Sequence, residues 1–360
     1  MDKVFKYELF NKMIRDFAVN EVKPLAHEVD EQERFPYETV EKMAKLGLMG
    51  IIVPKEYGGM GGDYKMYIKA VEELSKVCAT TGVILSAHTS LCIAPIMEYG
   101  NEEQKKKYLP KLASGEWLGA FGLTEPNAGT DANNQTTTAV KEGDHWVLNG
   151  SKIFITNAGP ANVYFVIAVT GRNPKGVECA AFIVEKGFPG FSVGKKELKM
   201  GIRGSSTCEL IFENCIVPEA NLVGKIGEGV KMALKTLDGG RVGISAQALG
   251  IAEGALEATV AYVKERKQFN KPISAFQNTQ FCLADLYTKI NAASLLVERA
   301  TEAKQNKSPM LGMYAAQAKL FAAETAMEVT TKCVQLHGGY GYTREYPVCL
   351  LYTSPSPRDS

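Results

Sequence analysis

The stretch Trp146-Val-Leu-Asn149-Gly150-Ser-Lys-Ile153-Phe-Ile155 decides the fold class of this 360-residue chain. Apolar and polar residues alternate on both sides of Asn149-Gly150, a dipeptide that is a strong short-range signal for a two-residue β-hairpin turn. We therefore predict a β-hairpin at this point. The pattern also sets the stretch apart from most of the remaining chain, whose apolar residues have helical spacing.

Strand-like patterning extends outward from this stretch only to about residues 119 and 222. Within these bounds, further predicted strands are Val163–Thr170, Cys179–Glu185 and Cys208–Phe212. The sequence thus predicts an α+β protein. Its expected parts are an N-terminal all-α domain at 1–118, a central β-barrel or sandwich domain at 119–222, and a C-terminal long-helix domain of the four-helix-bundle type at 223–348.

Composition and charge exclude several classes of function. Lys and Arg total 41 and Asp and Glu total 40, a formal net charge of +1, which argues against a nucleic-acid or polybasic membrane surface. Apolar runs are shorter than the roughly 18 residues of a membrane span, and the start has no apolar signal core. The eight cysteines and four histidines have no metal-ligand spacing. We expect a soluble, cytoplasmic enzyme without metal, nucleic-acid or membrane partners.

Dinucleotide-binding, P-loop and serine-hydrolase motifs are absent from the sequence. Four other segments combine glycine, polar and aromatic residues: Phe121–Asp131, Lys152–Asn157, Glu265–Ile273 and Gln335–Tyr342. Each has an ordinary structural explanation when taken alone: a loop, a packed strand, a solvated helix end, or a glycine turn. Each could also contact a flat or phosphorylated cofactor through backbone amides, an aromatic face, or cations.

Taken together and in this order, the four segments closely resemble the acyl-CoA dehydrogenase family, within it the short-chain, butyryl-CoA branch. The pieces that carry the resemblance are Leu123–Asp131, Asn149–Asn157, Arg266–Pro272 and Gln335–Gly339. The resemblance implies a flavoenzyme with non-covalent FAD. It also implies a homotetramer, an acyl-CoA substrate, and an electron-transfer flavoprotein as electron acceptor.

The resemblance also implies which residues form the site. Positions that match the family's cofactor-binding residues are Phe121, Leu123, Thr124, Gly129, Thr130, Phe154, Ile155, Thr156, Arg266, Phe269, Gln277, Gln335, Leu336, His337, Gly338 and Gly339. Those from Arg266 onward match residues that reach the FAD of a neighbouring subunit. Many relatives have Trp at the position of Phe154, which keeps the aromatic cover. Positions that match acyl-CoA contacts are Thr130, Asp238, Gly239, Gly240 and Arg241.

In the implied reaction, a carboxylate removes the α-proton of the thioester while a hydride leaves Cβ for the flavin. The family's usual base is a glutamate in a Tyr-Glu-Gly-Thr-type segment beyond the Gly-Gly pair, and the 360 residues contain no such segment. Some relatives carry the base at the position of Gly240. Neither Asp238 nor Glu345 is assigned as a substitute, so no catalytic residue is predicted.

The polar, proline-broken residues 349–360 do not continue the family pattern. We predict that they are a non-native tail on a C-terminally truncated and inactive chain, which leaves the last helical domain incomplete at its end. Three alternatives stay open: a non-catalytic FAD- or acyl-CoA-binding protein, an acyl-CoA oxidase that passes electrons to oxygen, and a purely structural helical protein.

Overall fold

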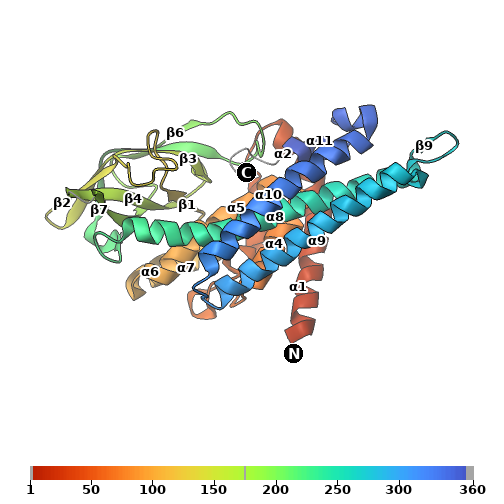
Figure 1. The fold of residues 1–360 in the computed structure, drawn as a ribbon. Coiled ribbons are helices and arrows are strands. Elements are labelled where there is room, and N and C mark those ends of the chain that lie inside the picture. Colours follow the sequence, from red (N-terminus) through yellow and green to blue (C-terminus); the bar gives the residue numbers. More distant parts are fainter. Residues whose placement is uncertain (1–2, 174–175, 354–360) are drawn as a thin grey trace.

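Helices from both ends of the chain cover one side of a central β region in the computed structural model, which describes residues 3–173 and 176–353 (Figure 1). The order helical, β, helical confirms the predicted α+β fold class. The N-terminal elements are α1 (Lys3–Phe17), η1 (Ala18–Val22), α2 (Lys23–Glu31), α3 (Tyr37–Lys45), η2 (Leu48–Gly50), η3 (Lys55–Tyr57), α4 (Tyr64–Ser75), α5 (Ala79–Ser86), η4 (Ala87–Ile93), α6 (Ala94–Tyr99) and α7 (Glu102–Ala113).

The stretch from α5 through η4 to α6 is one helical run of 21 residues, Ala79–Tyr99, with a π-helical segment at its centre. It is long and apolar enough to cross a membrane by length and composition, contrary to our expectation that no run approaches this limit. However, 83% of its most apolar window is buried inside the protein. This run is therefore a core helix, hidden from the sequence pattern by its interspersed Thr, Ser and His residues.

The β region is an eight-stranded sheet with the order β6-β7-β3-β2-β4-β5-β8, and β1 pairs in parallel with β4. Its strands are β1 (Gly119–Gly122), β2 (Thr138–Glu142), β3 (His145–Thr156), β4 (Val163–Asn173), β5 (Gly176–Glu185), β6 (Phe191–Lys196), β7 (Thr207–Pro218) and β8 (Leu222–Val223). A 3-10 turn, η5 (Glu219–Asn221), precedes β8.

The predicted hairpin turn at Asn149-Gly150 is wrong. These residues lie inside β3, which pairs with β7 on both sides of them, and the β2–β3 hairpin turns instead at Gly143-Asp144. Gly150 has φ +135°, and a Cβ there would lie 2.7 Å from Thr137 Cα. The glycine therefore permits a close backbone approach at an irregularity of the sheet.

Strand β4 is buried on both faces, which explains its unbroken apolar sequence. Val163, Phe165 and Ile167 belong to the large core shared with the helices. The alternate residues Tyr164 and Val166 belong to a second core inside the β region. Because successive side chains of a strand point to opposite faces, β4 forms the wall between the helical core and the β core.

The C-terminal part consists of three long helices, α8 (Gly229–Glu265), α9 (Gln277–Gln305) and α10 (Leu311–Leu336). Between α8 and α9 lie the small hairpin β9 (Lys267–Gln268) and β10 (Lys271–Pro272) and η6 (Ile273–Ala275). Gly250 and Gly254 of α8 have no room for a side chain, because a Cβ would lie 2.2 Å and 2.1 Å from carbonyl oxygens of α4 and the residue after it. The helices thus meet backbone to backbone.

The chain continues through η7 (Gly338–Tyr342) into α11 (Pro347–Thr353). Val348 and Leu351 are buried, and α11 contacts α2 and α8. Helix α11 thus runs across position 349, where we expect the family pattern to end. The remaining residues of the predicted tail, 354–360, lie outside the described residues.

His88 of η4 connects the helical and β regions while wholly buried. Its Nε2 donates to the carbonyl oxygen of Leu112 at 3.1 Å, and its Nδ1 accepts from the Gly119 amide at 3.0 Å. The ring is therefore neutral, with the proton on Nε2. Burial lowers the pKa of His88 to about 4, because a charged imidazole cannot be solvated there.

This burial predicts that the free energy of unfolding falls as the pH falls through the unfolded pKa of His88. The unfolded state then binds a proton that the folded state excludes. Between about pH 7.5 and about pH 5 the loss from this group should be about 2 kcal/mol. Urea unfolding at both pH values should show it. His88→Gln should be less stable at neutral pH but lose less on acidification. An equal loss in both proteins would contradict the assignment.

Candidate functional site

Five of the predicted cofactor residues lie at the end of β1 or in the loop between β1 and β2, in unequal environments. Phe121 and Leu123 are buried, and the Phe121 ring packs on Phe165 in the core. Thr124 is half-buried, and Gly129 and Thr130 are exposed. The first two therefore support the loop from below, whereas the last three lie where an external group can reach them.

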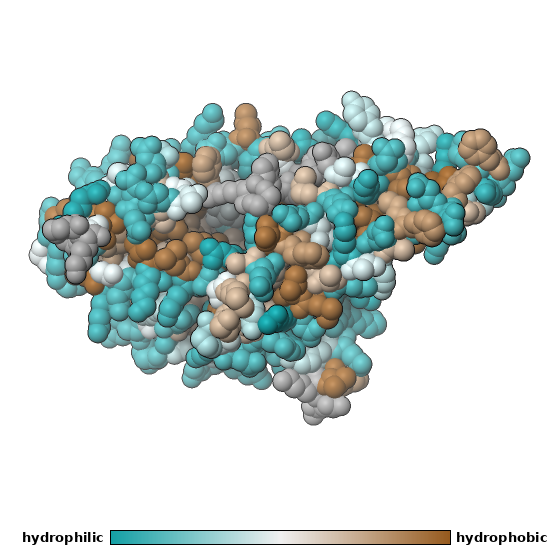
Figure 2. Space-filling model, in the orientation of Figure 1, coloured by the Kyte–Doolittle hydropathy of each residue, from teal (hydrophilic) through white to brown (hydrophobic). Residues whose placement is uncertain are grey.

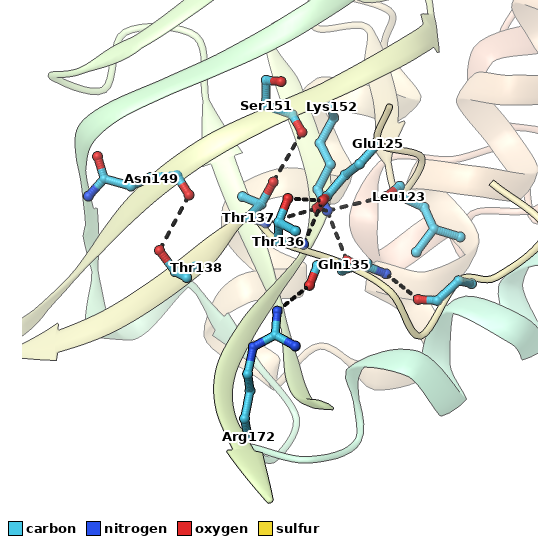
Figure 3. Close-up of polar contacts among 11 residues, drawn as sticks. Leu123, Glu125, Gln135, Thr136, Thr137, Thr138, Asn149, Ser151, Lys152 and Arg172 are labelled. Atoms are coloured by element: carbon cyan, nitrogen blue, oxygen red, sulfur yellow. Dashed lines mark hydrogen bonds and ion pairs between the residues drawn. The ribbon is translucent and has the colours of Figure 1, made fainter. Parts of the chain in front are cut away.

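A buried polar network closes the base of this loop (Figure 3). Lys152 of β3 is fully buried, and its Nζ lies 2.6 Å from Glu125 Oε1, 2.9 Å from Gln135 Oε1 and 3.2 Å from the Leu123 carbonyl oxygen. Glu125 in turn accepts from the amide and hydroxyl of Thr136 at 2.6 Å and 2.7 Å.

Both members of this pair are charged at neutral pH. Burial alone would raise the pKa of the Glu125 carboxyl, but the Lys152 ammonium and the Thr136 donors lower it to about 2. Burial lowers the pKa of Lys152, and the contact with Glu125 opposes this effect so that it stays at about 8. Each charge thus keeps the other ionised in a site without solvent.

Lys152 and Glu125 are functional candidates that the sequence prediction missed. One signal was available. Lys152 is separated by an even number of residues from Trp146 and Leu148 of β3, so it is expected on the same face of the strand, which packs into the β core. A charged residue at an inward position of an alternating strand needs a buried partner. The identity of that partner could not be deduced, because Glu125 lies 27 residues earlier.

The residues after Lys152 form a bulge that carries Phe154. Lys152 pairs with Leu210 and Ile155 with Cys208, so β3 holds one residue more than β7 between them. Phe154 has φ +59° and is 46% exposed. Ile155 is buried and Thr156 is half-buried. A left-handed conformation is strained for a bulky residue, typically by 1 kcal/mol or more, and here it presents the ring outside the core.

Two hydrogen bonds place this bulge beside the loop and the helices. The Ile153 amide donates to the Thr124 carbonyl oxygen at 2.8 Å. Asn157 is buried at the end of the bulge, and its Nδ2 donates to the Ile84 carbonyl of α5 at 3.1 Å. The structure therefore brings together Thr124, Phe154 and Thr156 at the seam between the sheet and α5.

The predicted acyl-CoA contacts Asp238–Arg241 lie on α8. A Cβ at Gly240 would lie 2.8 Å from Leu91 of η4, and one at Gly239 would lie 3.4 Å from Lys304 of α9. Arg241 Nη1 donates to Asp238 Oδ1 at 2.5 Å, which orients a guanidinium whose side chain is 42% exposed. Gly240 therefore allows close approach of α8 and η4 and offers no side chain for acid–base chemistry.

The remaining predicted cofactor residues lie far from this seam. The β9–β10 hairpin lies at the opposite end of the long helices from the sheet (Figure 1). Phe269 at its tip is 88% exposed, and Arg266 and Gln277 on either side are also exposed. Within one chain, the hairpin thus lies away from the sheet that carries Phe154 (Figure 1).

A cluster of aromatic rings organises the turn after α10. His337 is buried and stacks on Tyr262 at 4.2 Å between ring centroids, while Tyr346 contacts both rings. The Tyr262 hydroxyl donates to the His337 carbonyl oxygen at 3.2 Å, and the Arg266 guanidinium lies over the Tyr340 ring at 5.3 Å. The cluster joins Arg266 to the glycine turn.

The exposed ends of this turn suit close approach by a ligand. Gln335 is exposed and Leu336 is half-buried at the end of α10, and a Cβ on Gly338 or Gly339 would meet nothing within 4 Å. Figure 2 shows apolar side chains exposed toward the end of the molecule formed by α9 and the hairpin. Large exposed apolar residues of these elements include Phe269, Phe281, Tyr287 and Leu295.

Among residues 3–173 and 176–353, no group of three or more His, Cys, Asp or Glu side chains could hold a metal ion. A groove of about 720 Å³ lies between α1 and α3 and is lined by residues that include Leu9, Met13 and Leu46. It lies away from every predicted site residue.

Comparisons with known proteins find matches along nearly the whole chain. Residues 6–116, 120–215 and 227–354 match the sequence models of the acyl-CoA dehydrogenase N-terminal, middle and C-terminal domains. A short-chain specific acyl-CoA dehydrogenase of Clostridium acetobutylicum is 60% identical over 341 residues, which span 95% of this chain and 90% of the relative. This coverage gives no support to the predicted C-terminal truncation.

Solved structures show the same similarity in three dimensions. Butyryl-CoA dehydrogenase from Megasphaera elsdenii is 48% identical with a TM-score of 0.93, covering 96% of this chain and 91% of that one. A chain in the structure of the electron transferring flavoprotein of Acidaminococcus fermentans is 53% identical with a TM-score of 0.93, at the same coverage.

The strained conformation of Phe154 makes a prediction that requires no ligand. Phe154→Gly and Phe154→Ala both remove the ring, but only alanine keeps a Cβ at φ +59°. We expect the glycine variant to have the higher free energy of unfolding, by about 1 kcal/mol. Urea unfolding of the apoprotein measures the difference. At Val140, an exposed residue of β2, the same pair should reverse in order. The same order at both positions would refute the strain.

Proposed function

Because the chain belongs to the acyl-CoA dehydrogenase family, we propose that it binds FAD and a short-chain acyl-CoA thioester. The proposed reaction is the α,β-dehydrogenation of the thioester to the trans-2-enoyl-CoA, with electrons passed to an electron-transfer flavoprotein. One observation of the structure carries the proposal: Phe154, in a strained bulge, stands partly exposed beside the Thr124 loop. Core packing would not require this strain, whereas an aromatic cover for a flat ring would.

The residues present fit FAD. The half-buried Thr124 and Thr156 supply hydroxyl groups on either side of Phe154, and the exposed Gly129 leaves the loop backbone open. Arg266 and the open Gly338-Gly339 turn supply a cation and accessible amides of the kind that bind a pyrophosphate. When bound, the flavin would accept the hydride; the chain's own residues would bind and orient both ligands.

We propose that Thr130 and Asp238–Arg241 contact the acyl-CoA. Asp238 holds the Arg241 guanidinium in a fixed direction while leaving it partly exposed. The short-chain preference is supported by the 60% identical relative, which is short-chain specific, and by the butyryl-CoA dehydrogenase. Gly240 supplies no carboxylate, and Asp238 is already paired with Arg241.

The separation of the two residue groups supports a site completed by a second copy. Arg266, Phe269 and Gln277 lie on the hairpin end, far from Phe154, and large apolar side chains are exposed around them (Figures 1 and 2). We propose that the hairpin end and the Gln335–Gly339 turn reach FAD bound by a neighbouring chain, within a homotetramer. An exposed apolar surface next to an incomplete site is typical of an oligomer interface. We also propose a cytoplasmic location, which suits the unpaired cysteines of the described chain.

Two other functions remain distinguishable by experiment. An acyl-CoA oxidase would reoxidise its flavin with oxygen, so reoxidation rates with and without oxygen separate it from the dehydrogenase. A non-catalytic binding protein would hold FAD and acyl-CoA without transferring a hydride.

The proposed cofactor and substrate predict that this chain, purified with FAD, is yellow. Its flavin absorption spectrum should change on addition of butyryl-CoA. We expect the thioester also to bleach the flavin absorption, because the proposed reaction transfers a hydride to the flavin. Anaerobic titration followed by a dye-coupled assay measures both. A protein without bound FAD would overturn the cofactor assignment. Binding of butyryl-CoA without reduction of the flavin would favour the non-catalytic binding protein.

Complementation between two variants tests whether the FAD site is shared between neighbouring chains. Arg266→Ala and Phe154→Ala should each weaken FAD binding in homo-oligomers. In a mixed oligomer of the two variants, a site made from the Phe154→Ala chain and the neighbouring Arg266→Ala chain has both substitutions. The reciprocal site has the native residue at both positions. FAD binding should therefore partly recover. Co-expression with two affinity tags isolates the mixed species for flavin titration. Lys141→Met, at an exposed ion pair with Glu219, serves as the neutral partner. No recovery in the mixed oligomer would place both residues at the same site of one chain.

A further inference from the structure

We propose that Lys152 and Glu125 are positioning residues for the flavin site. Their buried ion pair holds both ends of the 123–137 loop on β3 and thereby sets the position of Thr124 relative to Phe154 (Figure 3). The role toward the flavin rests on the FAD binding proposed above. The arrangement of the loop is a property of the protein alone and can be measured without cofactor.

Every hydrogen-bonding group of the pair is used. The three N–H groups of the Lys152 ammonium donate to Leu123, Glu125 and Gln135. On Glu125, Oε1 accepts from Lys152 and from the Thr137 amide at 3.1 Å, and Oε2 accepts from the amide and hydroxyl of Thr136. Three donors on one side and four acceptor sites on the other are the full capacity of these groups.

These partners belong to the two ends of one loop. Leu123 and Glu125 lie at its start, and Gln135, Thr136 and Thr137 lie at its end. Between them, exposed residues such as Gly129 and Thr130 extend into solvent. Lys152 thus draws together the two backbone segments at the ends of the loop. We call this arrangement, made of Leu123, Glu125, Gln135, Thr136, Thr137 and Lys152, the loop clamp.

The loop clamp is joined directly to the bulge. Lys152 pairs with Leu210 and is the last regularly paired residue of β3 before the extra residue. The next residue, Ile153, donates its amide to the Thr124 carbonyl oxygen at 2.8 Å, and Phe154 follows. A shift of Lys152 or of Glu125 would therefore change the separation between Thr124 and the Phe154 ring.

Stability alone does not account for a buried pair of this kind. Removing two charges from water is costly, and apolar residues of similar volume are often as stable or more stable in the same place. The apolar alternative, however, would leave the amides of Thr136 and Thr137 without their acceptor. The specific gain from the pair is thus the fixed geometry of the loop.

The test separates positioning from stability by comparing three variants. Lys152→Met leaves Glu125 buried and unpaired. The double variant Glu125→Leu with Lys152→Met removes both charges at similar volume. Lys141→Met, which breaks the exposed ion pair with Glu219 on the same sheet, is the matched control. For each protein, thermal unfolding, amide hydrogen exchange of residues 124–137 in the apoprotein, and FAD affinity by flavin fluorescence are measured.

We expect Lys152→Met to lower the melting temperature, to speed exchange in the loop, and to weaken FAD binding by at least about tenfold. The double variant should recover part of the melting temperature, because no charge is left buried and unpaired although the Thr136 and Thr137 amides lose their acceptor. Loop exchange should stay fast and FAD binding should stay weak. Lys141→Met should change none of the three. If Lys152→Met does not fold, the double variant alone provides the decisive comparison.

The proposal is wrong if the double variant binds FAD as the wild type does and protects the loop equally well, because the pair would then serve stability only. A wild-type protein that binds no FAD would instead refute the proposed cofactor. In that case, loop exchange in the apoproteins still decides whether the loop clamp fixes the loop. Slow exchange in the double variant would refute it, and fast exchange would support it.

Discussion

Burial of both faces of β4 is the constraint from which the arrangement of the domains follows. One face packs into the core shared with the helices and the other into the core of the β region. A strand in this position cannot move relative to either core without exposing apolar surface to water. The parallel pairing of β1 with β4 then places the start of the 123–137 loop at the boundary of the two regions. The candidate site lies at that boundary for this reason.

Polar groups are also buried around this strand, and several of them make directional contacts between elements. His88 links the carbonyl of Leu112 to the amide of Gly119, and Asn157 reaches the carbonyl of Ile84. Lys152 and Glu125 complete the set. These contacts cross from one element to another, so they fix relative positions that apolar packing alone leaves adjustable. A site that must hold a flat ring against a hydroxyl benefits from such directional contacts.

The two ends of the molecule have opposite character. At the sheet end, the site residues are supported by buried networks. At the hairpin end, Phe269 and its neighbours are exposed, while the aromatic cluster around His337 fixes the turn beneath them. The aromatic cluster orders the turn beneath the exposed hairpin tip. Such order favours binding of another molecule, because little conformational entropy remains to be lost on binding. The proposed second copy would cover this tip and complete the site in the same step.

The sequence by itself determined the three regions, the long helices and the four segments that identify the family. These follow from periodicity and from the order of residues along the chain, which need no knowledge of distant neighbours. Only the tertiary structure decided that Asn149-Gly150 lies within a strand rather than in a turn, because Thr137, which approaches Gly150 closely, lies just before β2 and not beside it in sequence. It also decided that Lys152 is buried against Glu125. Local patterns report what a residue prefers among its neighbours in sequence, whereas a buried charge is compensated by a partner that only the fold brings within reach.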